Sequence, residues 1–274
     1  MKNIIKSGIN ANILKTIAII AMVIDHIGVY FMPFMPNFLY GILRNIGRIA
    51  MPIFSYLIVQ GFFHTKNYKK YITRLGICAI ATQVFITILM TINKIYVPEY
   101  LNAKYIYTNG NVLFSYIIGL VLIKIIHEDI LIKKWDYHKN MSFKIIISIL
   151  ILIATVFIPL DYGIEAVLLV VLLYFIERFR LYILINKNTY NISLFKLIDD
   201  KKIKIIYSVL VFLAISIVVI YFKKSLFTIL SIIPIMLYND EHGSYNKFLK
   251  YAFYIVFPFQ HILLYSLAMI FMFT

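Results

Sequence analysis

The chain has 274 residues, of which 62% are hydrophobic and only 14% are charged. An average soluble domain is about half apolar, and a chain this apolar would expose large hydrophobic patches to water, so we exclude one soluble domain. The formal net charge of +15 could suit nucleic acid. However, the basic residues recur in alternate segments between apolar runs, which is the pattern of membrane topology. Nucleic-acid binding is excluded too.

Several apolar runs reach the ~20 residues that a helix needs to cross the hydrocarbon core. Barrel strands would be about ten residues long and would alternate in polarity. The sequence therefore predicts an all-α, polytopic membrane bundle of about nine (8 to 10) transmembrane helices, forming a single domain, 1–274. The eighth span contains Pro234 and is short, so we expect it to be kinked or re-entrant. The spans are 13–32, 42–63, 71–93, 111–127, 143–159, 162–180, 204–222, 225–239 and 250–273.

The first apolar run continues to Met32 and contains Asp25 and His26. A cleaved signal peptide would have a short apolar core followed by a small-residue cleavage site, so we expect a retained first helix. The one cysteine, Cys78, lies inside an apolar run. It excludes a disulfide framework and a cysteine-based metal site, and we expect it to be a buried core residue.

The distribution of Lys and Arg predicts the orientation. With the N-terminus in the cytoplasm, 21 of the 27 basic residues fall in cytoplasmic segments, and Arg44 and Arg48 lie near the outer end of the second span. This bias predicts a multi-pass protein of the bacterial cytoplasmic membrane with its N-terminus inside. Nine spans would put the C-terminus outside, and a re-entrant eighth span would put it inside. The outer loops hold Lys94, Lys104, Lys223 and Lys224.

Ionisable groups inside membrane spans are costly unless paired or hydrated, so each is a functional candidate. Asp25 and His26 form a carboxylate–imidazole pair in the first span. A carboxylate can fix the tautomer of an imidazole and raise its basicity, as a general base requires. Adjacent helical residues point about 100° apart, however, so the two side chains could serve different partners. The alternative is a structural polar pair that holds helices together.

Arg44 and Arg48 are four residues apart and share a helical face. Together they could bind an anion or the Asp25 carboxylate, the alternative being interfacial snorkelling. Asn111, which opens the fourth span, could be a helix cap or a substrate contact.

Asp161 and Glu165 come in and just after the turn between the fifth and sixth spans. Asp161 could cap the sixth span, whereas Glu165 lies deeper and has no cap role. His261, in the middle of the last span, could be a structural hydrogen-bonding group or an acid–base residue. His242 lies beside Asp240 and Glu241, but no second histidine stands at helical metal spacing, and we expect no metal.

A basic stretch follows the second span, from His64 to Arg74. It could be plain positive-inside charge or a landing site for the phosphates of an anionic cofactor such as coenzyme A.

Five blocks, in this order along the chain, resemble the TraX family of membrane proteins. They are LKTIAIIAMVIDHIG (14–28), LRNIGRIAMPIFSYLIVQGFFHTKNYKKYITRL (43–75), NVLFSYIIGL (111–120), DYGIEAVLL (161–169), and YNDEHG with the later FYIVFPFQHILL (238–264). Family members are implicated in N-terminal acetylation of conjugative pilin. The family resembles a larger membrane acyltransferase superfamily that includes O-acetylases of surface sugars.

That superfamily has a basic residue eleven positions before a histidine in its first helix, and Lys15 and His26 have this separation. The two lie roughly 16 Å apart along a helix, so Lys15 could meet cofactor phosphates as a point charge while His26 meets the acyl group. The chain departs from the family pattern at Gln60 and Gln83, where acids are common.

The resemblance implies an acyl-CoA-dependent N- or O-acyltransferase. It would move an acyl group, most simply from acetyl-CoA, to a peptide N-terminus or an envelope glycan. His26 would be the general base, and Asp25 would orient it or pair with Arg44. The expected residues are His26, Asp25 and His261 for catalysis; Arg44, Arg48, Asn111, Asp161 and Glu165 for the substrate; and Lys15, His64, Lys66, Lys69, Lys70 and Arg74 for the cofactor.

Two alternatives remain open. The buried charges could line the proton or anion path of a transporter or flippase. Against this, the sequence shows no internal repeat and no matched pair of broken helices. A non-catalytic scaffold would need no charges within the membrane.

Overall fold

A computed structural model describes residues 8–96, 110–129, 131–189, 200–222, 225–241, 243 and 247–273. These residues form helices and turns with no β-strand, apart from two isolated bridges. The predicted all-α class is therefore confirmed. The elements are α1 (Ala11–Tyr30), the 3-10 helix η1 (Met32–Phe34), α2 (Asn37–Gly47), α3 (Ala50–His64), α4 (Tyr68–Tyr96), α6 (Val112–His127), α7 (Tyr137–Phe157), α8 (Gly163–Thr189), α10 (Asp200–Tyr221), the 3-10 helix η3 (Leu226–Ser231), α11 (Ile232–Met236) and α12 (Lys247–Phe273).

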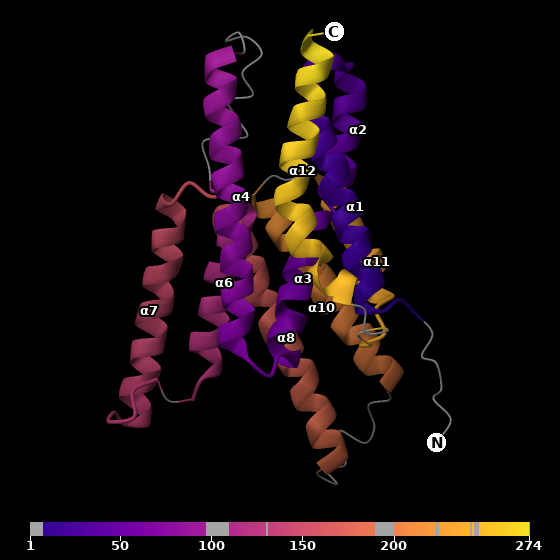
Figure 1. Ribbon diagram of the computed structural model, residues 1–274. Coiled ribbons are helices and arrows are strands. Elements are labelled where there is room, and N and C mark those ends of the chain that lie inside the picture. The colour runs from indigo at the N-terminus through magenta and orange to yellow at the C-terminus, as the bar shows by residue number, and fades with distance from the viewer. Residues whose placement is uncertain are drawn as a thin grey trace.

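The described helices pass up and down through the bundle in the order that the sequence predicts (Figure 1). α2 and α3 together make the second pass, and η3 with α11 makes the eighth. The eighth pass begins beside α2, where Ser225 donates a hydrogen bond to the Asn45 side chain at 2.8 Å. It returns to the start of α1, where Ile9 N–H donates to Leu237 O at 2.8 Å. The beginning of α1 and the end of α12 therefore lie at opposite ends of the bundle.

Six described segments are long and apolar enough to cross a membrane: Ala11–Tyr30, Asn37–His64, Tyr68–Leu89, Tyr137–Phe157, Lys201–Tyr221 and Tyr251–Met272. The molecule is thus an integral membrane protein. The fourth and eighth predicted spans correspond to the shorter apolar helices Val112–His127 and Leu226–Met236, which confirms that the eighth is short.

Several predicted spans differ from the structure at their ends; the fifth, for example, begins at Tyr137 rather than at residue 143. The second begins at Asn37 rather than at residue 42, and its helix is interrupted at Arg48 and Ile49. The sixth continues past residue 180 to Thr189. It can do so because Glu177 and Arg180 neutralise each other inside the protein, through hydrogen bonds of 2.6 and 3.1 Å.

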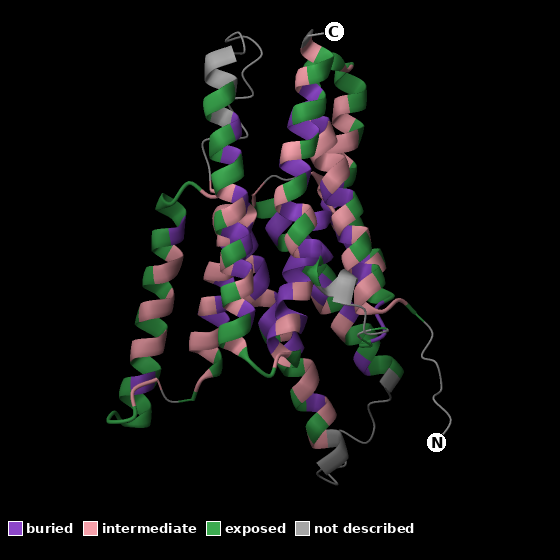
Figure 2. Cartoon of the chain, in the orientation of Figure 1, coloured by how far each residue is buried: buried purple, intermediate pink, exposed green. Residues whose placement is uncertain are grey.

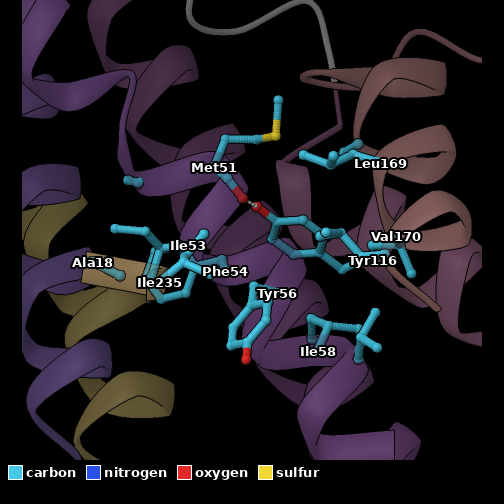
Figure 3. Packing of buried hydrophobic residues seen from close by; sticks show 14 of the residues in the cluster. Ala18, Met51, Ile53, Phe54, Tyr56, Ile58, Tyr116, Leu169, Val170 and Ile235 are labelled. Atoms are coloured by element: carbon cyan, nitrogen blue, oxygen red, sulfur yellow. Dashed lines mark hydrogen bonds between the residues drawn. The ribbon is translucent and has the colours of Figure 1, made fainter. Parts of the chain in front are cut away.

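α3 is the central helix, and most of its side chains are buried. It packs against α1, α6 and α8. In Figure 3 the Tyr116 hydroxyl of α6 donates to the Met51 carbonyl at the top of α3, a 3.1 Å bond within the apolar core. α7 lies at the edge of the bundle and is largely exposed (Figure 2). Its apolar exposed face, including Ile146, Leu150 and Phe157, suits contact with lipid.

An ion cluster fixes the turn before α12. The Arg180 guanidinium donates to Asp240 at 2.7 Å as well as to Glu177, and it lies 4.9 Å from the ring centroid of Tyr207. Asp240 follows Asn239, whose N–H donates to Ile9 O at 3.0 Å. The cluster therefore anchors the segment on which the start of α1 rests.

Candidate active site

A cavity of about 450 Å³ lies among α1, α2, α3, α6, α12 and the turn before α8. Its size is that of a small-molecule site. The cavity brings together seven residues that the sequence singled out from five separate blocks: Asp25, His26, Arg44, Arg48, Asn111, Asp161 and His261. Apolar residues that include Met22, Val29, Phe54 and Phe257 form much of the remaining wall.

The tautomer of His26 follows from its backbone contact. Its Nδ1 lies 2.9 Å from the Met22 carbonyl oxygen, one helical turn earlier. A carbonyl can only accept, so Nδ1 carries the proton and Nε2 keeps the lone pair. His26 thus has the form of a general base without help from a carboxylate.

His261 of α12 packs against His26, with ring centroids 4.6 Å apart and the planes inclined by 71°. The His261 side chain is buried, and its Nδ1 is 2.9 Å from the Tyr30 hydroxyl. Tyr30 lies one turn after His26, so both face α12 from the same side of α1. The three side chains form a polar string from the cavity into the interface of α1 and α12.

Asp25 pairs with Arg44, whose Nη1 donates to Oδ2 at 2.5 Å. Of the two roles expected for Asp25, the structure therefore shows the ion pair. The Asp25 side chain packs directly against Gly47. A Cβ atom at residue 47 would overlap the Cβ and Oδ1 atoms of Asp25. Only a glycine at residue 47 lets α1 and α2 approach closely enough for this pair.

Arg48 belongs to a different contact. Its Nη1 donates to the Tyr162 hydroxyl at 2.7 Å. Tyr162 has a φ of 55°, in the left-handed region that is rare for residues other than glycine. Such strain is commonly found at functional sites. The neighbouring backbone holds it, since Gly110 N–H donates to Pro159 O and Asp161 N–H donates to Gly110 O, at 2.8 and 2.7 Å.

Asp161 lines the cavity with an exposed side chain. Because α8 begins at Gly163, the residue at its N-cap position is Tyr162, and Asp161 stands one residue earlier. Ser115 of α6 donates to the Asp161 carbonyl at 3.0 Å and fixes its backbone. The cavity wall therefore contains the carboxylate of Asp161 as well as the guanidinium groups of Arg44 and Arg48.

Asn111 is the N-cap of α6, and its Oδ1 accepts from Leu113 N–H at 3.2 Å. Its Nδ2 donates to Ala79 O and to Gln83 Oε1, at 2.9 and 3.1 Å. The cap alternative is therefore correct, and a substrate contact stays a prediction. Gln83 Oε1 accepts from both the backbone and the side chain of Asn111.

The remaining predicted residues lie away from this cavity. Glu165 is in the first turn of α8 and does not line it. The basic residues expected to bind the cofactor are found in the second turn of α1 and around the turn between α3 and α4. None of them lines the cavity, and their role stays a prediction. They are Lys15, His64, Lys66, Lys69, Lys70 and Arg74.

Four contributors to the site escaped sequence reasoning: the Met22 carbonyl, Tyr30, Gly47 and Tyr162. Tyr30 had a detectable signal, since it stands four residues after His26 and shares its helical face. The Met22 carbonyl lies one turn before His26 in the same helix, so helical spacing also permits that contact. Gly47 and Tyr162 depend on contacts between elements that no local pattern encodes. Among the described residues, no group of three or more His, Cys, Asp or Glu side chains could hold a metal ion.

The model of the family described as TraX protein matches residues 10–269, nearly the entire chain. The chain belongs to the TraX family. The match includes α1, the α2–α3 pair, the turn before α8 and α12, which supply the ionisable residues of the cavity.

Two curated relatives match over shorter stretches. The probable fimbrial assembly protein FimC, serogroup H1, of Dichelobacter nodosus is 33% identical over 112 residues, which are 41% of this chain and 44% of that protein. An uncharacterised protein of Rickettsia prowazekii (strain Madrid E) is 40% identical over 109 residues, or 38% of this chain and 40% of the relative. The chain thus matches less than half the length of each. No solved structure matches it.

Proposed function

We propose that this TraX-family protein is a membrane-embedded acyltransferase that moves an acyl group, most simply acetyl, from acyl-CoA to an amine or hydroxyl of a peptide or envelope-glycan acceptor. The observation that carries the proposal is a lone-pair-bearing His26 Nε2 in a cavity that also contains two guanidinium groups and an exposed carboxylate. The family's association with pilin N-acetylation agrees with a peptide acceptor, as does the name of the Dichelobacter relative, a probable fimbrial assembly protein.

In the proposed step, His26 Nε2 removes a proton from the acceptor nucleophile as it attacks the thioester carbonyl carbon. A carbon–nitrogen or carbon–oxygen bond forms, the carbon–sulfur bond breaks, and the released thiolate takes the proton back to leave as the thiol. The negative charge that develops on the carbonyl oxygen needs a preorganised donor. Arg48 supplies it, because a guanidinium has five N–H donors and the hydrogen bond to Tyr162 uses one.

The acceptor is held by charge. Asp161 lines the cavity with an exposed side chain, and its carboxylate attracts the ammonium form of the acceptor; that ammonium loses one proton to solvent before the neutral amine attacks. Arg44 is already neutralised by Asp25, so that pair positions α1 against α2 rather than binding an anion. His261 supports the base through ring packing, and its own partner is Tyr30. These contacts favour an amine acceptor over a neutral hydroxyl.

The acyl donor would arrive from the end of the bundle at which the basic residues gather. Exposed Lys66, Lys69 and Lys70 lie at that end, and Lys15 lies one helical turn into α1. We propose that this end faces the cytoplasm, in accord with the positive-inside rule, and that these residues bind the phosphates of coenzyme A. His26 is further along α1, so the donor would be extended toward the cavity.

Release of free thiol from acetyl-CoA tests the proposal. Protein in proteoliposomes, supplied with acetyl-CoA and a peptide that has a free N-terminal amine, should release free CoA and yield an N-acetylated peptide. The same peptide with a blocked N-terminus is the control and should give no product. A protein that moves an ion or peptide in response to an imposed proton gradient, and releases no thiol at millimolar acetyl-CoA, would instead be the transporter.

A further inference from the structure

A second groove, which shares no lining residue with the cavity around His26, lies between α10 and α11 and has a volume of about 550 Å³. The two helices are side by side in the fold (Figure 1). The groove belongs to neither the cavity around His26 nor the basic stretch after α3. Its walls are Lys201, Lys204, Ile205, Ser208, Val209, Phe212, Ile232 and Met236.

The wall residues of α10 occupy one helical face, because they recur at intervals of three and four. The α11 residues Ile232 and Met236 are also four apart. The polarity of the groove changes along its length. Exposed Lys201 and Lys204 stand in the first turns of α10, and apolar side chains line the rest except for the buried Ser208. One end is therefore cationic and the other end is suited to a hydrocarbon.

The length of this face matches one leaflet of a bilayer. From Lys201 to Phe212 a helix rises by about 16 Å, roughly half of the ~30 Å hydrocarbon core. The lysines lie at the end of the bundle where α1 begins, the end that carries most of the basic residues. A phospholipid of the leaflet at that end would place its headgroup phosphate near the lysines and an acyl chain along the apolar wall.

We propose that this groove is a binding site for one anionic phospholipid, whose phosphate is held by Lys201 and Lys204 and whose acyl chain fills the seam between α10 and α11. Charge complementarity selects the headgroup, since basic pockets between membrane helices recognise anionic lipids. The acyl chain would cover the exposed side of the short η3–α11 segment. The proposal does not depend on the acyltransferase activity.

The lipid-site proposal can be tested by native mass spectrometry of the detergent-solubilised full chain. The experiment compares the binding of phosphatidylglycerol and phosphatidylcholine that have identical acyl chains. One phosphatidylglycerol should bind more tightly than phosphatidylcholine. Each basic group near an anionic headgroup contributes about fivefold. K201Q/K204Q should therefore weaken phosphatidylglycerol binding about 30-fold, and K204Q alone about fivefold. K202Q removes the same charge in the same turn but lies outside the groove, and it should leave binding unchanged.

Val209→Trp fills the apolar wall without altering charge and should also abolish binding, with Ile205→Trp as a second variant if the first unfolds. Thermal unfolding in lipid-free detergent identifies variants that retain the fold. Equal losses in K202Q and K204Q would show diffuse attraction to a basic surface and overturn the proposal. So would equal binding of the two lipids, or undiminished binding in both folded tryptophan variants.

Discussion

At the scale of single residues, the sequence predicted the ingredients of the cavity but not all of their pairings. Asp25 and His26 are neighbours along α1, and helical geometry already separated their directions. The structure assigns His26 to the Met22 carbonyl and Asp25 to Arg44. The choice between the two roles expected for Asp25 could not be made from the sequence, because it depends on where α2 crosses α1. The sequence also could not distinguish Arg48 from Arg44, which differ only in the partner that each reaches.

The ion pair of Arg44 and Asp25 gives a stability prediction. Arg44→Met should lower the free energy of unfolding by about 3 kcal/mol, because it leaves a partly buried carboxylate without a partner. Asp25→Leu combined with Arg44→Met should recover most of that loss, since no uncompensated charge remains. Thermal or denaturant unfolding in detergent measures both variants. Additive losses in the double variant would show that the two groups are not coupled.

At the scale of elements, the apolar runs predicted the existence and order of the passes well, because a helix that crosses the membrane needs about 20 apolar residues, although Val112–His127 and Leu226–Met236 are shorter. Their ends were less certain. Burial of Glu177 with Arg180 extends α8, and the interruption at Arg48 and Ile49 divides one predicted span into α2 and α3. Both features follow from contacts between helices, which hydropathy does not record.

Gly47 and Gly41, both in α2, form a matched pair for testing how closely α1 and α2 approach. A Cβ at Gly47 would overlap Asp25, whereas a Cβ at Gly41 would meet nothing within 4 Å. Gly47→Ala should destabilise the fold by about 1–3 kcal/mol through overpacking. Gly41→Ala should stabilise it by about 0.5–1 kcal/mol, because alanine favours the helix. Thermal or denaturant unfolding in detergent measures the stability of both variants. Equal effects of the two substitutions would contradict the close approach of α1 and α2 at Gly47.

At the scale of the whole molecule, the start of α1 and the end of α12 lie at opposite ends of the bundle. The distribution of basic residues predicts which end faces the cytoplasm. The cavity, by contrast, gathers residues from five blocks separated by as many as 236 positions, from Asp25 to His261. Sequence reasoning could group them only because an ionisable residue within a membrane span is conspicuous wherever it stands.

Accessibility of introduced cysteines tests the topology. In a Cys78→Ala background, a membrane-impermeant thiol reagent applied to intact cells should label Asn37→Cys and Phe271→Cys, at the outer end. It should label Lys70→Cys and Lys134→Cys only after permeabilisation. All four native side chains are exposed, so accessibility reports the side of the membrane. Labelling of the lysine positions in intact cells would reverse the proposed orientation.

The most direct test of the account is acetyl transfer by His26→Asn. An asparagine amide can still donate to the Met22 carbonyl, so the fold should be retained, but it has no basic nitrogen to take a proton. We predict that the purified variant unfolds at the wild-type temperature and forms N-acetylated peptide from acetyl-CoA about 10²–10⁴-fold more slowly than wild type, as loss of a general base requires. A folded His26→Asn protein that acetylates the peptide at the wild-type rate would contradict the central claim.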